Sequence, residues 1–442
     1  MVRVLLVGNG AREHVIAESL SKSPNCQSLF SFMKANNPGI TRVSKKVTVG
    51  KYSEIAQIVD FAVENKVDFA VVGPEDPLNE GVVDVLAKKG IAAVGPSKSL
   101  ARLETSKSFT RDLLRKYQIK GNPDYQYFDS LQGIAEFIAS LDGVVIKPDG
   151  LTGGKGVVVQ GDHFTNTQEA LAICEKYLAE YPRILVEEKL EGEEFSLQCL
   201  CDGKTVVATP AVQDHKRRFD GDTGPNTGGM GSYSYPDHLL PFISEGDLVE
   251  GLAITKSVAE AIFQETGELY KGVMYAGFMV TKKGLMLLEY NARFGDPEAM
   301  NILPLLKTDF VELCQAIIEG SLASLPVVFE NYATVCKYVV PKGYGLPDDH
   351  PYNRYTSTKL TVGEVGPARL YYSSVDQKDD GIHFSSSRAI GVVGIAPEIE
   401  EAQRIAQNAV MAIGGEVAHR SDIGTPELIA KRIANMKKIR GA

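Results

Sequence analysis

The chain has 442 residues, of which 44% are hydrophobic and 23% are charged, and its formal net charge is -9. This length exceeds the size at which one hydrophobic core keeps growing, so it predicts two to four domains. The composition is ordinary for a globular protein and argues against disorder. The acidic balance argues against a nucleic-acid partner but is compatible with a basic pocket for one phosphorylated metabolite.

The six cysteines and seven histidines are scattered along the chain, without the CxxC, HExxH or HxH spacing that is typical of zinc sites. Any metal is therefore expected to have oxygen ligands. The apolar runs are as long as strands and far shorter than the roughly 20 residues that cross a bilayer. The N-terminus lacks the features of a signal peptide. The sequence thus predicts a cytoplasmic protein with no membrane segment and reduced cysteines.

The first hundred residues alternate between strand and helix patterns. The apolar run Arg3–Val7 predicts a strand, which is followed by the glycine turn Gly8–Gly10 and by a helix that starts at Arg12. Further strands are expected at 68–72 and 91–94, and further helices at 53–64 and 80–89. This alternation predicts an open parallel α/β sheet, which forms an N-terminal domain over residues 1–101.

The glycine turn suggests that the first helix presents its N-terminus to a phosphate, because unpaired N–H groups and the helix dipole both favour an anion. Arg12 would add a full positive charge. A dinucleotide-binding fingerprint would need a third glycine where the chain has Glu13, and an acidic residue near the end of the second strand, which is missing. NAD binding is therefore disfavoured, whereas a purely structural tight turn remains an alternative.

From Ser99 to Tyr117 the pattern is helical, and a second domain is expected over residues 102–325. Within it, residues 122–190 are expected to form a lid subdomain. Its predicted elements are a helix at 131–141, strands at 143–146 and 157–160, a helix at 167–180 and a strand at 184–187.

The two strands at 143–146 and 157–160 flank a glycine-rich loop, Lys147–Gly156. The loop is not a Walker A motif, because the spacing fails and a strand rather than a helix follows it. It predicts a β-hairpin lid whose backbone N–H groups close on nucleotide phosphates and exclude water. An ordinary glycine hairpin is the alternative. The strand Val186–Lys189 offers a hinge for adenine.

The segments Gln213–Arg218 and Asp222–Tyr233 are polar and rich in glycine. This composition does not fit a core element and predicts loops that handle substrate. Asp214 or Lys216 could bind an amine or an anion, and His215 is a possible base. A solvated charged loop is the alternative.

The strand pattern at Leu285–Leu288 leads to Glu289 and Asn291, which are two residues apart and so lie on one face. Mg²⁺ prefers one or two such oxygens together with water and phosphates. Arg293 would bind a phosphate or carboxylate through its planar fork. An exposed strand end with an internal ion pair is the alternative. Tyr290 should face the opposite side and pack.

The rest of the chain predicts a small mixed α/β domain over residues 326–442, with short strands, a helix at 399–411 and a last helix before the C-terminus.

Taken in order, these segments resemble the phosphoribosylamine–glycine ligase family of ATP-grasp enzymes over essentially the whole chain. The most specific stretches are Gln213-Asp-His-Lys-Arg217, Asp222-Thr-Gly-Pro-Asn-Thr-Gly-Gly-Met-Gly231 and Asn291-Ala-Arg-Phe-Gly-Asp-Pro-Glu298. The segments Gly8–His14, Val72–Glu75 and Arg420–Gly424 extend the resemblance towards both ends. Two stretches depart from the family: the loop 147–156 lacks the alanines of many members, and residues 32–39 replace a Pro-Gly-Asn-x-Gly turn.

The resemblance implies an N-terminal domain on the phosphoribosylamine side, an ATP-grasp core with a glycine-rich lid, and a C-terminal domain, as a monomer or homodimer. It implies that ATP phosphorylates glycine to glycyl phosphate and that the amine of 5-phosphoribosylamine then displaces phosphate. The cofactors would be ATP and Mg²⁺ or Mn²⁺. Another ATP-grasp carboxylate–amine ligase, or a catalytically silent ATP-binding protein, is the alternative.

The resemblance also assigns expected roles to individual residues. Nucleotide binding is expected of Lys107, Lys147, Gly153, Gly154, Lys155, Gly156, Glu187, Glu188 and Glu193. Substrate binding is expected of Gly10, Arg12, Glu13, Glu75, Asp214 and Arg293. Catalysis is expected of Arg293, Asp214 and Lys216, and metal binding of Glu289 and Asn291.

Overall fold

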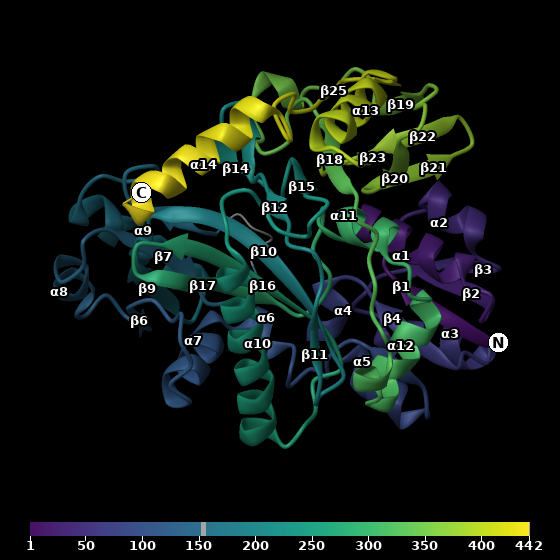
Figure 1. Cartoon of the computed structure of the whole chain (residues 1–442), viewed down its shortest axis with the longest axis horizontal. Coiled ribbons are helices and arrows are strands. Elements are labelled where there is room, and N and C mark those ends of the chain that lie inside the picture. The colour runs from purple at the N-terminus through teal and green to yellow at the C-terminus, as the bar shows by residue number, and fades with distance from the viewer. Residues whose placement is uncertain (152–155, 442) are drawn as a thin grey trace.

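The computed structural model of the chain describes residues 1–151 and 156–441. In Figure 1 the N-terminal region lies on the right and the C-terminal region above it, while long central strands lead to a group of smaller elements on the left. Among the described helices, none combines the length and the apolar character that crossing a membrane requires.

The N-terminal region is a five-stranded parallel sheet in the order β3-β2-β1-β4-β5, as the alternating pattern predicts. All four residues of β4 are buried, which is typical of a parallel sheet covered by helices on both faces. The strands are β1 (Val2–Val7), β2 (Cys26–Met33), β3 (Lys46–Val49), β4 (Phe69–Val72) and β5 (Ala92–Val94). The helices are α1 (Ala11–Lys22), α2 (Pro38–Val43), α3 (Ile55–Glu64), α4 (Glu75–Asn79) and α5 (Val82–Lys88).

The strand order of this sheet reverses between β1 and β4. In open α/β sheets, ligands bind outside the carboxyl ends of the strands at such a switch point. The segments that leave β1 and β4 at this edge are Gly8–Gly10, which leads into α1, and Gly73–Pro74, which leads into α4. The topology therefore places Arg12 and Glu75 at one edge of the sheet.

The helical pattern predicted from Ser99 to Tyr117 is confirmed, and it is divided between two helices: α6 (Arg102–Thr105) and α7 (Lys107–Lys116). Ser106 separates them with an extended backbone, and its side chain accepts a hydrogen bond from the Phe109 N–H. A serine at this position stabilises a helix start by satisfying a free N–H group. The break puts Lys107 in the first turn of α7.

The next elements form an antiparallel sheet in the order β6-β9-β7-β8 with two helices. The strands β7 and β8 pair as a hairpin, which confirms that a strand follows the glycine-rich loop. The apolar side chains of this unit, which include Ile134, Ile146 and Val186, form a core of their own. Its elements are β6 (Tyr125–Phe128), α8 (Ile134–Ala139), β7 (Val144–Pro148), β8 (Val158–Val159), α9 (Thr167–Glu180) and β9 (Ile184–Glu188). We call this unit the lid.

The central sheet has the order β11-β10-β16-β17, and the long helix α10 packs on it. Its strands are β10 (Gly192–Cys201), β11 (Val206–Ala208), β16 (Gly272–Thr281) and β17 (Gly284–Asn291), and α10 spans Glu245–Thr266. After β17 come α11 (Ala299–Ile302), η1 (Leu303–Leu305), α12 (Phe310–Glu319) and η2 (Leu322–Ser324).

The polar segments between 213 and 234 were expected to be loops, and this expectation is wrong in part. They form the short strands β12 (Gln213–Asp214), β13 (Arg217–Phe219), β14 (Thr223–Asn226) and β15 (Gly231–Ser234). Every residue of β15 is buried. Polar residues can occupy these positions because internal partners satisfy them: Gln213 binds the Glu194 carbonyl and the Tyr233 hydroxyl, and Arg218 binds the Tyr344 carbonyl.

The C-terminal region shares a sheet with these segments, because β18 pairs with both β15 and β23. Its strands are β18 (Ala333–Pro341), β19 (Lys359–Val362), β20 (Arg369–Tyr372), β21 (Val375–Lys378), β22 (Gly381–Phe384), β23 (Ile390–Ala396), β24 (Ile413–Gly414) and β25 (Val417–Ala418). Its helices are η3 (Pro351–Asn353), α13 (Ile399–Met411), which has its predicted bounds, and α14 (Pro426–Arg440). Helix α14 leaves this region and packs on β10 (Figure 1).

His14 joins α1 to the C-terminal region. Its imidazole is fully buried and stacks on Tyr372 at 5.9 Å between ring centroids, and its Nδ1 accepts a hydrogen bond from the Tyr372 N–H at 2.9 Å. Burial, assisted by the charges of Arg42 and Lys22, lowers the pKa of His14 to about 3. The folded protein therefore keeps this imidazole neutral at pH values where the unfolded chain protonates it.

We expect His14 to make the folded protein less stable in mild acid. Between pH 7 and pH 5 it should remove about 2 kcal/mol from the free energy of unfolding, since the unfolded imidazole titrates near about pH 6.5. In His14→Gln the amide oxygen can accept the Tyr372 N–H, and the side chain does not titrate. Between pH 7 and pH 5 the free energy of unfolding of this variant should therefore fall by about 2 kcal/mol less than that of wild type. Urea unfolding of both proteins at the two pH values measures this difference. Equal losses would contradict it.

Candidate active site

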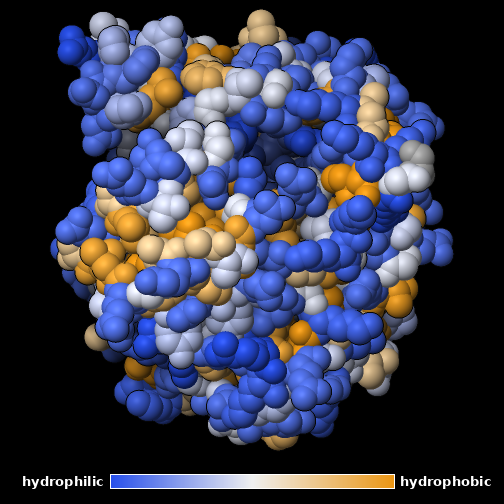
Figure 2. Space-filling model, turned by 90° about the vertical axis from the view of Figure 1, so that its left-hand side faces the viewer, coloured by the Kyte–Doolittle hydropathy of each residue, from blue (hydrophilic) through white to orange (hydrophobic). Residues whose placement is uncertain are grey.

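A cavity of about 600 Å³ lies between the lid, the central sheet and the N-terminal region. The face turned to the viewer in Figure 2 is hollowed, and mostly hydrophilic side chains surround the hollow. The predicted residues that line the cavity are Arg12, Glu75, Lys107, Lys147, Glu187, Glu188, Glu193, Asp214, Lys216, Glu289, Asn291 and Arg293. Gly10, Glu13 and Gly156 are described but do not line it, and Gly153, Gly154 and Lys155 lie outside the described residues.

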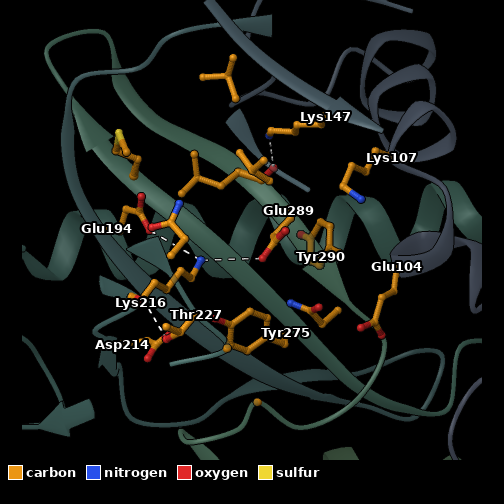
Figure 3. A pocket seen from close by; sticks show the side chains of 18 of the residues that line it. Glu104, Lys107, Lys147, Glu194, Asp214, Lys216, Thr227, Tyr275, Glu289 and Tyr290 are labelled. Atoms are coloured by element: carbon orange, nitrogen blue, oxygen red, sulfur yellow. Dashed lines mark hydrogen bonds and ion pairs between the residues drawn. The ribbon is translucent and has the colours of Figure 1, made fainter. Parts of the chain in front are cut away.

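Two lysines enter the cavity from the side of the lid and α7 (Figure 3). Lys107 donates a hydrogen bond to the Gly150 carbonyl at 2.7 Å. Lys147, on β7, forms an ion pair with Glu187 on the neighbouring strand β9 at 2.5 Å. Both ammonium groups line the cavity, so this wall favours an anionic ligand.

The carboxylate of Glu187 is already bound by protein groups. Besides Lys147, it pairs with the buried guanidinium of Arg111, whose Nε lies 2.6 Å from it. Burial would raise the pKa of Glu187, but the charges of Arg111 and Lys147 outweigh burial and lower it to about 2. Glu187 therefore fixes Lys147, and its carboxylate is not free to bind a ligand.

The end of β17 presents Glu289 and Asn291 to the cavity. Tyr290 between them also borders the cavity, but it is 2% exposed and its hydroxyl lies 3.1 Å from that of Thr255 on α10, so its side chain packs as predicted. Burial opposes ionisation of Glu289, but Lys216, Lys107 and Lys147 outweigh it and lower its pKa. Glu289 is thus a carboxylate among cations at the strand end.

Lys216 lies between two carboxylates (Figure 3). Its Nζ is 3.8 Å from Glu194 and 3.9 Å from Glu289. Burial would lower the pKa of Lys216, but these two carboxylates raise it above its ordinary value. Glu193 was the predicted residue of this pair, and both Glu193 and Glu194 line the cavity. On β10 the two alternate, and Glu193 is 3% exposed. The carboxylate of Glu194 is the one that faces Lys216, and strand alternation was a signal that could have found it.

Asp214 lies next to Lys216 and the Glu298 carboxylate. Its Oδ1 is buried and has no hydrogen-bond partner among the described residues. Burial and the charge of Glu298 raise the pKa of Asp214 well above its ordinary value. A cationic ligand, such as an ammonium group, would satisfy this oxygen and favour its charged form.

His215, a possible base in the sequence analysis, is buried, and its Nδ1 lies 3.4 Å from Asp222. Burial lowers the pKa of His215 to about 4 although Asp222 opposes this shift. An imidazole with this pKa is a weak base at neutral pH. We therefore assign His215 to the packing of this segment and not to proton transfer.

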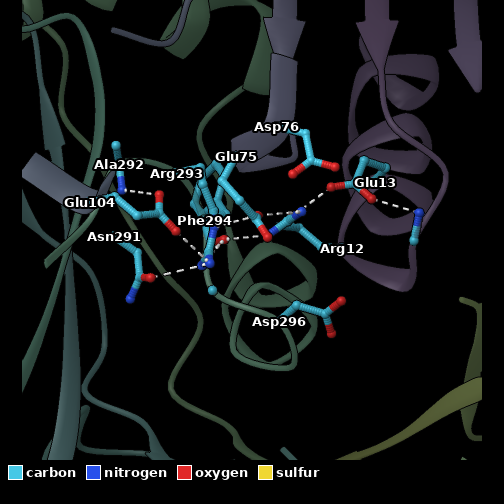
Figure 4. A network of polar contacts seen from close by, with 12 residues as sticks. Arg12, Glu13, Glu75, Asp76, Glu104, Asn291, Ala292, Arg293, Phe294 and Asp296 are labelled. Atoms are coloured by element: carbon cyan, nitrogen blue, oxygen red, sulfur yellow. Dashed lines mark hydrogen bonds and ion pairs between the residues drawn. The ribbon is translucent and has the colours of Figure 1, made fainter. Parts of the chain in front are cut away.

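A network of ion pairs connects the N-terminal region to the end of β17 (Figure 4). Arg293 pairs with Glu104 at 2.8 Å and with Glu75 at 3.3 Å, and its Nη2 donates to the Asn291 Oδ1 at 3.2 Å. Arg12 lies 3.9 Å from Glu75 on the other side. The network holds the N-terminal region against the candidate metal ligand Asn291.

The two carboxylates that Arg293 joins differ in their titration. Burial would raise the pKa of Glu75, but Arg293 and Arg12 outweigh burial and lower it to about 2. Burial raises the pKa of Glu104 to about 7 although Arg293 opposes this shift. No sequence motif predicted Glu104 as a site residue, because one glutamate in a helical pattern gives no signal of what it will face.

The N-terminus of α1 was expected to be open to a phosphate, and the structure corrects this expectation. The Gly10 N–H donates to the Glu13 carboxylate at 2.6 Å, and the same carboxylate pairs with Arg12 at 2.5 Å. A phosphate at this point would meet a negative charge. Glu13, which is fixed by the Gly10 N–H, therefore holds Arg12 in place.

The donor set fits a hard divalent cation that keeps other ligands. The described residues gather no group of three His, Cys, Asp or Glu side chains that could hold a metal by themselves. Glu289 and Asn291 offer two oxygens, and Mg²⁺ commonly takes one or two protein oxygens together with phosphates and water. The neighbouring lysines suit a phosphorylated ligand.

Comparisons with known proteins agree with this geometry. Residues 2–104 match the family model of the phosphoribosylglycinamide synthetase N domain, and residues 105–299 match that of its ATP-grasp (A) domain. A phosphoribosylamine–glycine ligase of Methanosarcina barkeri is 45% identical over 440 residues and covers 100% of both chains. One of Methanocaldococcus jannaschii is 47% identical over 455 residues and covers 99% of this chain and 100% of its own.

Solved structures show the same architecture. The crystal structure of a phosphoribosylamine–glycine ligase from Thermotoga maritima has a TM-score of 0.79 and 25% identity, covering 95% of this chain and 100% of its own. The biotin carboxylase domain of a Hydrogenobacter thermophilus 2-oxoglutarate carboxylase has a TM-score of 0.70 at 16% identity, covering 99% and 94%. This chain therefore has the ATP-grasp fold and belongs to the phosphoribosylamine–glycine ligase family.

Proposed function

We propose that this chain joins glycine to 5-phosphoribosylamine with ATP, giving glycinamide ribonucleotide, ADP and phosphate. One observation carries the proposal. The end of β17 presents Glu289 and Asn291, whose oxygens can bind a metal, to lysines in the cavity. The same cavity reaches the switch point of the N-terminal sheet. The cavity can thus bring a nucleotide, an amino acid and a phosphorylated amine together.

The nucleotide is assigned to the space between the lid and β17. Apolar lining from Val145 and Leu288 suits the faces of a base, and the strand end at Glu188 and Lys189 offers backbone groups for its edge. The phosphates would then lie towards Lys147 and Lys107. Because ammonium groups stabilise the charge that develops on a transferring phosphoryl group, this orientation also serves the reaction.

Glu289 and Asn291 would hold Mg²⁺ or Mn²⁺, and family membership implies the use of a divalent metal. When bound, the metal neutralises phosphate charge and orients the phosphoryl group for transfer. Lys216 keeps the carboxylate of Glu289 ionised, so the ligand is ready for a cation at neutral pH. Arg293 holds the amide of Asn291 by its oxygen, and this contact would have to yield to the metal.

Glycine is assigned to the region of Asp214, Lys216 and Arg293. The unpartnered oxygen of Asp214 suits the ammonium group of glycine, and the two cations suit its carboxylate. A carboxylate oxygen attacks the γ-phosphorus of ATP, and ADP leaves as the bond to its oxygen breaks. This gives glycyl phosphate, whose acyl carbon is a far better electrophile than that of a carboxylate.

The amine is assigned to the edge of the N-terminal sheet. Arg12 and Glu75 line the cavity there, and Glu13, fixed by the Gly10 N–H, holds Arg12. The amine nitrogen attacks the acyl carbon, a C–N bond forms, the bond to phosphate breaks and the amine gives up a proton.

In this scheme residues 1–101 bind the amine and residues 102–325 bind ATP and glycine. Residues 326–442 complete the sheet that contains β15, because β18 pairs with β15. The chain would act as a monomer or homodimer.

ADP release tests the proposal directly. Purified protein with ATP, Mg²⁺, glycine and freshly generated 5-phosphoribosylamine is expected to release ADP, and omission of any one component should abolish the release. If ADP forms without 5-phosphoribosylamine, the assigned amine is wrong. If a different amino acid replaces glycine without loss, another carboxylate–amine ligase is indicated. If ATP binds and nothing turns over, the chain is a silent binder.

A further inference from the structure

Helix α14, the last helix of the chain, reaches the cavity although it follows the C-terminal region. In Figure 1 it runs from that region across the central strands towards the lid, and it packs on β10. Its start is well defined, because Thr425 caps it by accepting from the Leu428 N–H and Pro426 occupies its first turn. Arg432 on α14 is among the residues that line the cavity.

Arg432 is bound to two carboxylates that come from different parts of the chain. Its Nη1 lies 3.1 Å from Glu193 on β10, and its Nη2 lies 2.5 Å from Asp222, which connects β13 to β14. Asn435, one turn later on α14, donates to the other oxygen of Glu193 at 2.6 Å. Both oxygens of Glu193 are therefore held by α14.

Asp222 has a backbone conformation that non-glycine residues rarely adopt. Its φ is 58°, in the left-handed region, and its carboxylate is also bound by Arg420 at 2.9 Å and faces His215 at 3.4 Å. The residues that follow Asp222 lead to Asn226 and Thr227 in the cavity wall. The contact with Arg432 thus connects the shape of this wall to α14.

Glu193 and Asp222 are the carboxylates of the cavity lining that α14 binds. Three further carboxylates of the lining have other cations as partners: Glu188 pairs with Lys283, Glu194 with Lys216 and Asp162 with Arg217. A nucleotide with several negative charges would be repelled by Glu193 and Asp222 if they were unpaired. Arg420 is fully buried and is shared with Asp422, whereas Arg432 lines the cavity beside Glu193 and Asp222.

We propose that Arg432 is a positioning residue of the nucleotide site, which neutralises Glu193 and Asp222 so that this end of the cavity accepts a polyanion. The proposal rests on the nucleotide placement proposed above. It makes α14 a part of that site and not only an outer cover of β10.

Equilibrium binding of ADP with Mg²⁺, measured by calorimetry, tests this role. Arg432→Gln should weaken binding on the order of tenfold, the effect of one unit charge about 10 Å from the ligand at an effective dielectric constant of about 20. The loss should shrink in high salt, because screening weakens a repulsion between charges and would not restore a lost contact. Arg440→Gln is the matched control, since Arg440 lies on the same helix and pairs with Asp247 outside the cavity.

Two further variants separate the possible outcomes. Glu193→Gln combined with Arg432→Gln should bind ADP within about threefold of wild type, because both charges are gone; this pair also serves if Arg432→Gln alone does not fold. Lys147→Met reports on the nucleotide placement. If Lys147→Met loses ADP and Arg432→Gln does not, the role of Arg432 is wrong and the placement stands. If neither variant weakens binding, both the role of Arg432 and the nucleotide placement are wrong. If the double variant binds as weakly as Arg432→Gln, the neutralisation is wrong.

Discussion

Glu289→Gln is expected to lower kcat for ADP release by about three orders of magnitude while ADP still binds. The substitution removes the one carboxylate at the end of β17 that pairs with Lys216 and removes a proposed metal ligand. Loss of metal stabilisation of a transferring phosphoryl group removes several kcal/mol of transition-state stabilisation. Nucleotide affinity should change much less, because Lys107 and Lys147 remain in the wall.

The comparison of kcat with affinity makes this prediction specific. Titration of Mn²⁺ in the presence of ADP should show weaker metal binding to Glu289→Gln than to wild type, which a merely structural defect would not produce. Glu265→Gln is the control, because this exposed residue of α10 pairs with Lys116 far from the cavity. Full activity of Glu289→Gln, or unchanged Mn²⁺ binding, would remove Glu289 from the metal site.

Local sequence patterns predicted the parts of this fold that depend on near neighbours in the chain. The open parallel sheet followed from apolar runs that alternate with helices, and the hairpin followed from a glycine loop between two apolar strands. The face of Tyr290 followed from the two-residue period of a strand. These features need only the chemistry of about ten successive residues, so a sequence can carry them.

The missed features depend on residues far apart in the chain. Burial of the polar strand β15 requires its pairing with β18, about a hundred residues later, which no local pattern reveals. The contact of Arg432 with Glu193 joins positions separated by more than half the chain. The break at Ser106 is different, because a serine within a helical pattern is a local signal for a helix cap.

The candidate site divides in the same way. Motifs indicated which residue types the chemistry needs, and most of the described ones line one cavity. Their partners were not predictable, because Glu187 and Glu193 look like free ligands in the sequence but are bound by Arg111 and by α14. A motif lies within one short stretch of sequence, whereas the two partners of an ion pair can lie far apart in the chain.

Arg293→Met is expected to destabilise the folded protein by about 3–5 kcal/mol near pH 8, the range observed when one partner of a buried ion pair is removed. Glu104 would be left buried beside Glu75, with Arg12 at 3.9 Å from Glu75 as the nearest remaining cation of the network. Urea unfolding of the variant and of wild type at pH 8 measures the difference.

The loss should depend on pH with a definite sign. Burial raises the pKa of Glu104 to about 7 even with Arg293 present, so without Arg293 this carboxyl should hold its proton more firmly. A raised carboxyl pKa stabilises the folded state below that pKa, and the stabilisation disappears as the pH rises through it. Arg293→Met should therefore be closer to wild type at pH 5.5 than at pH 8. A constant difference would contradict the role of Glu104.

Adding Glu104→Gln separates stability from chemistry at this position. The double variant Arg293→Met with Glu104→Gln should recover much of the lost stability at pH 8, because no unpaired charge remains at residue 104. It should stay inactive, because the guanidinium that holds Asn291 and faces the proposed glycine site is still missing. If the stabilised double variant regains ligase activity, Arg293 serves only to hold the N-terminal region in place, and the cation that meets the substrate has to be Lys216.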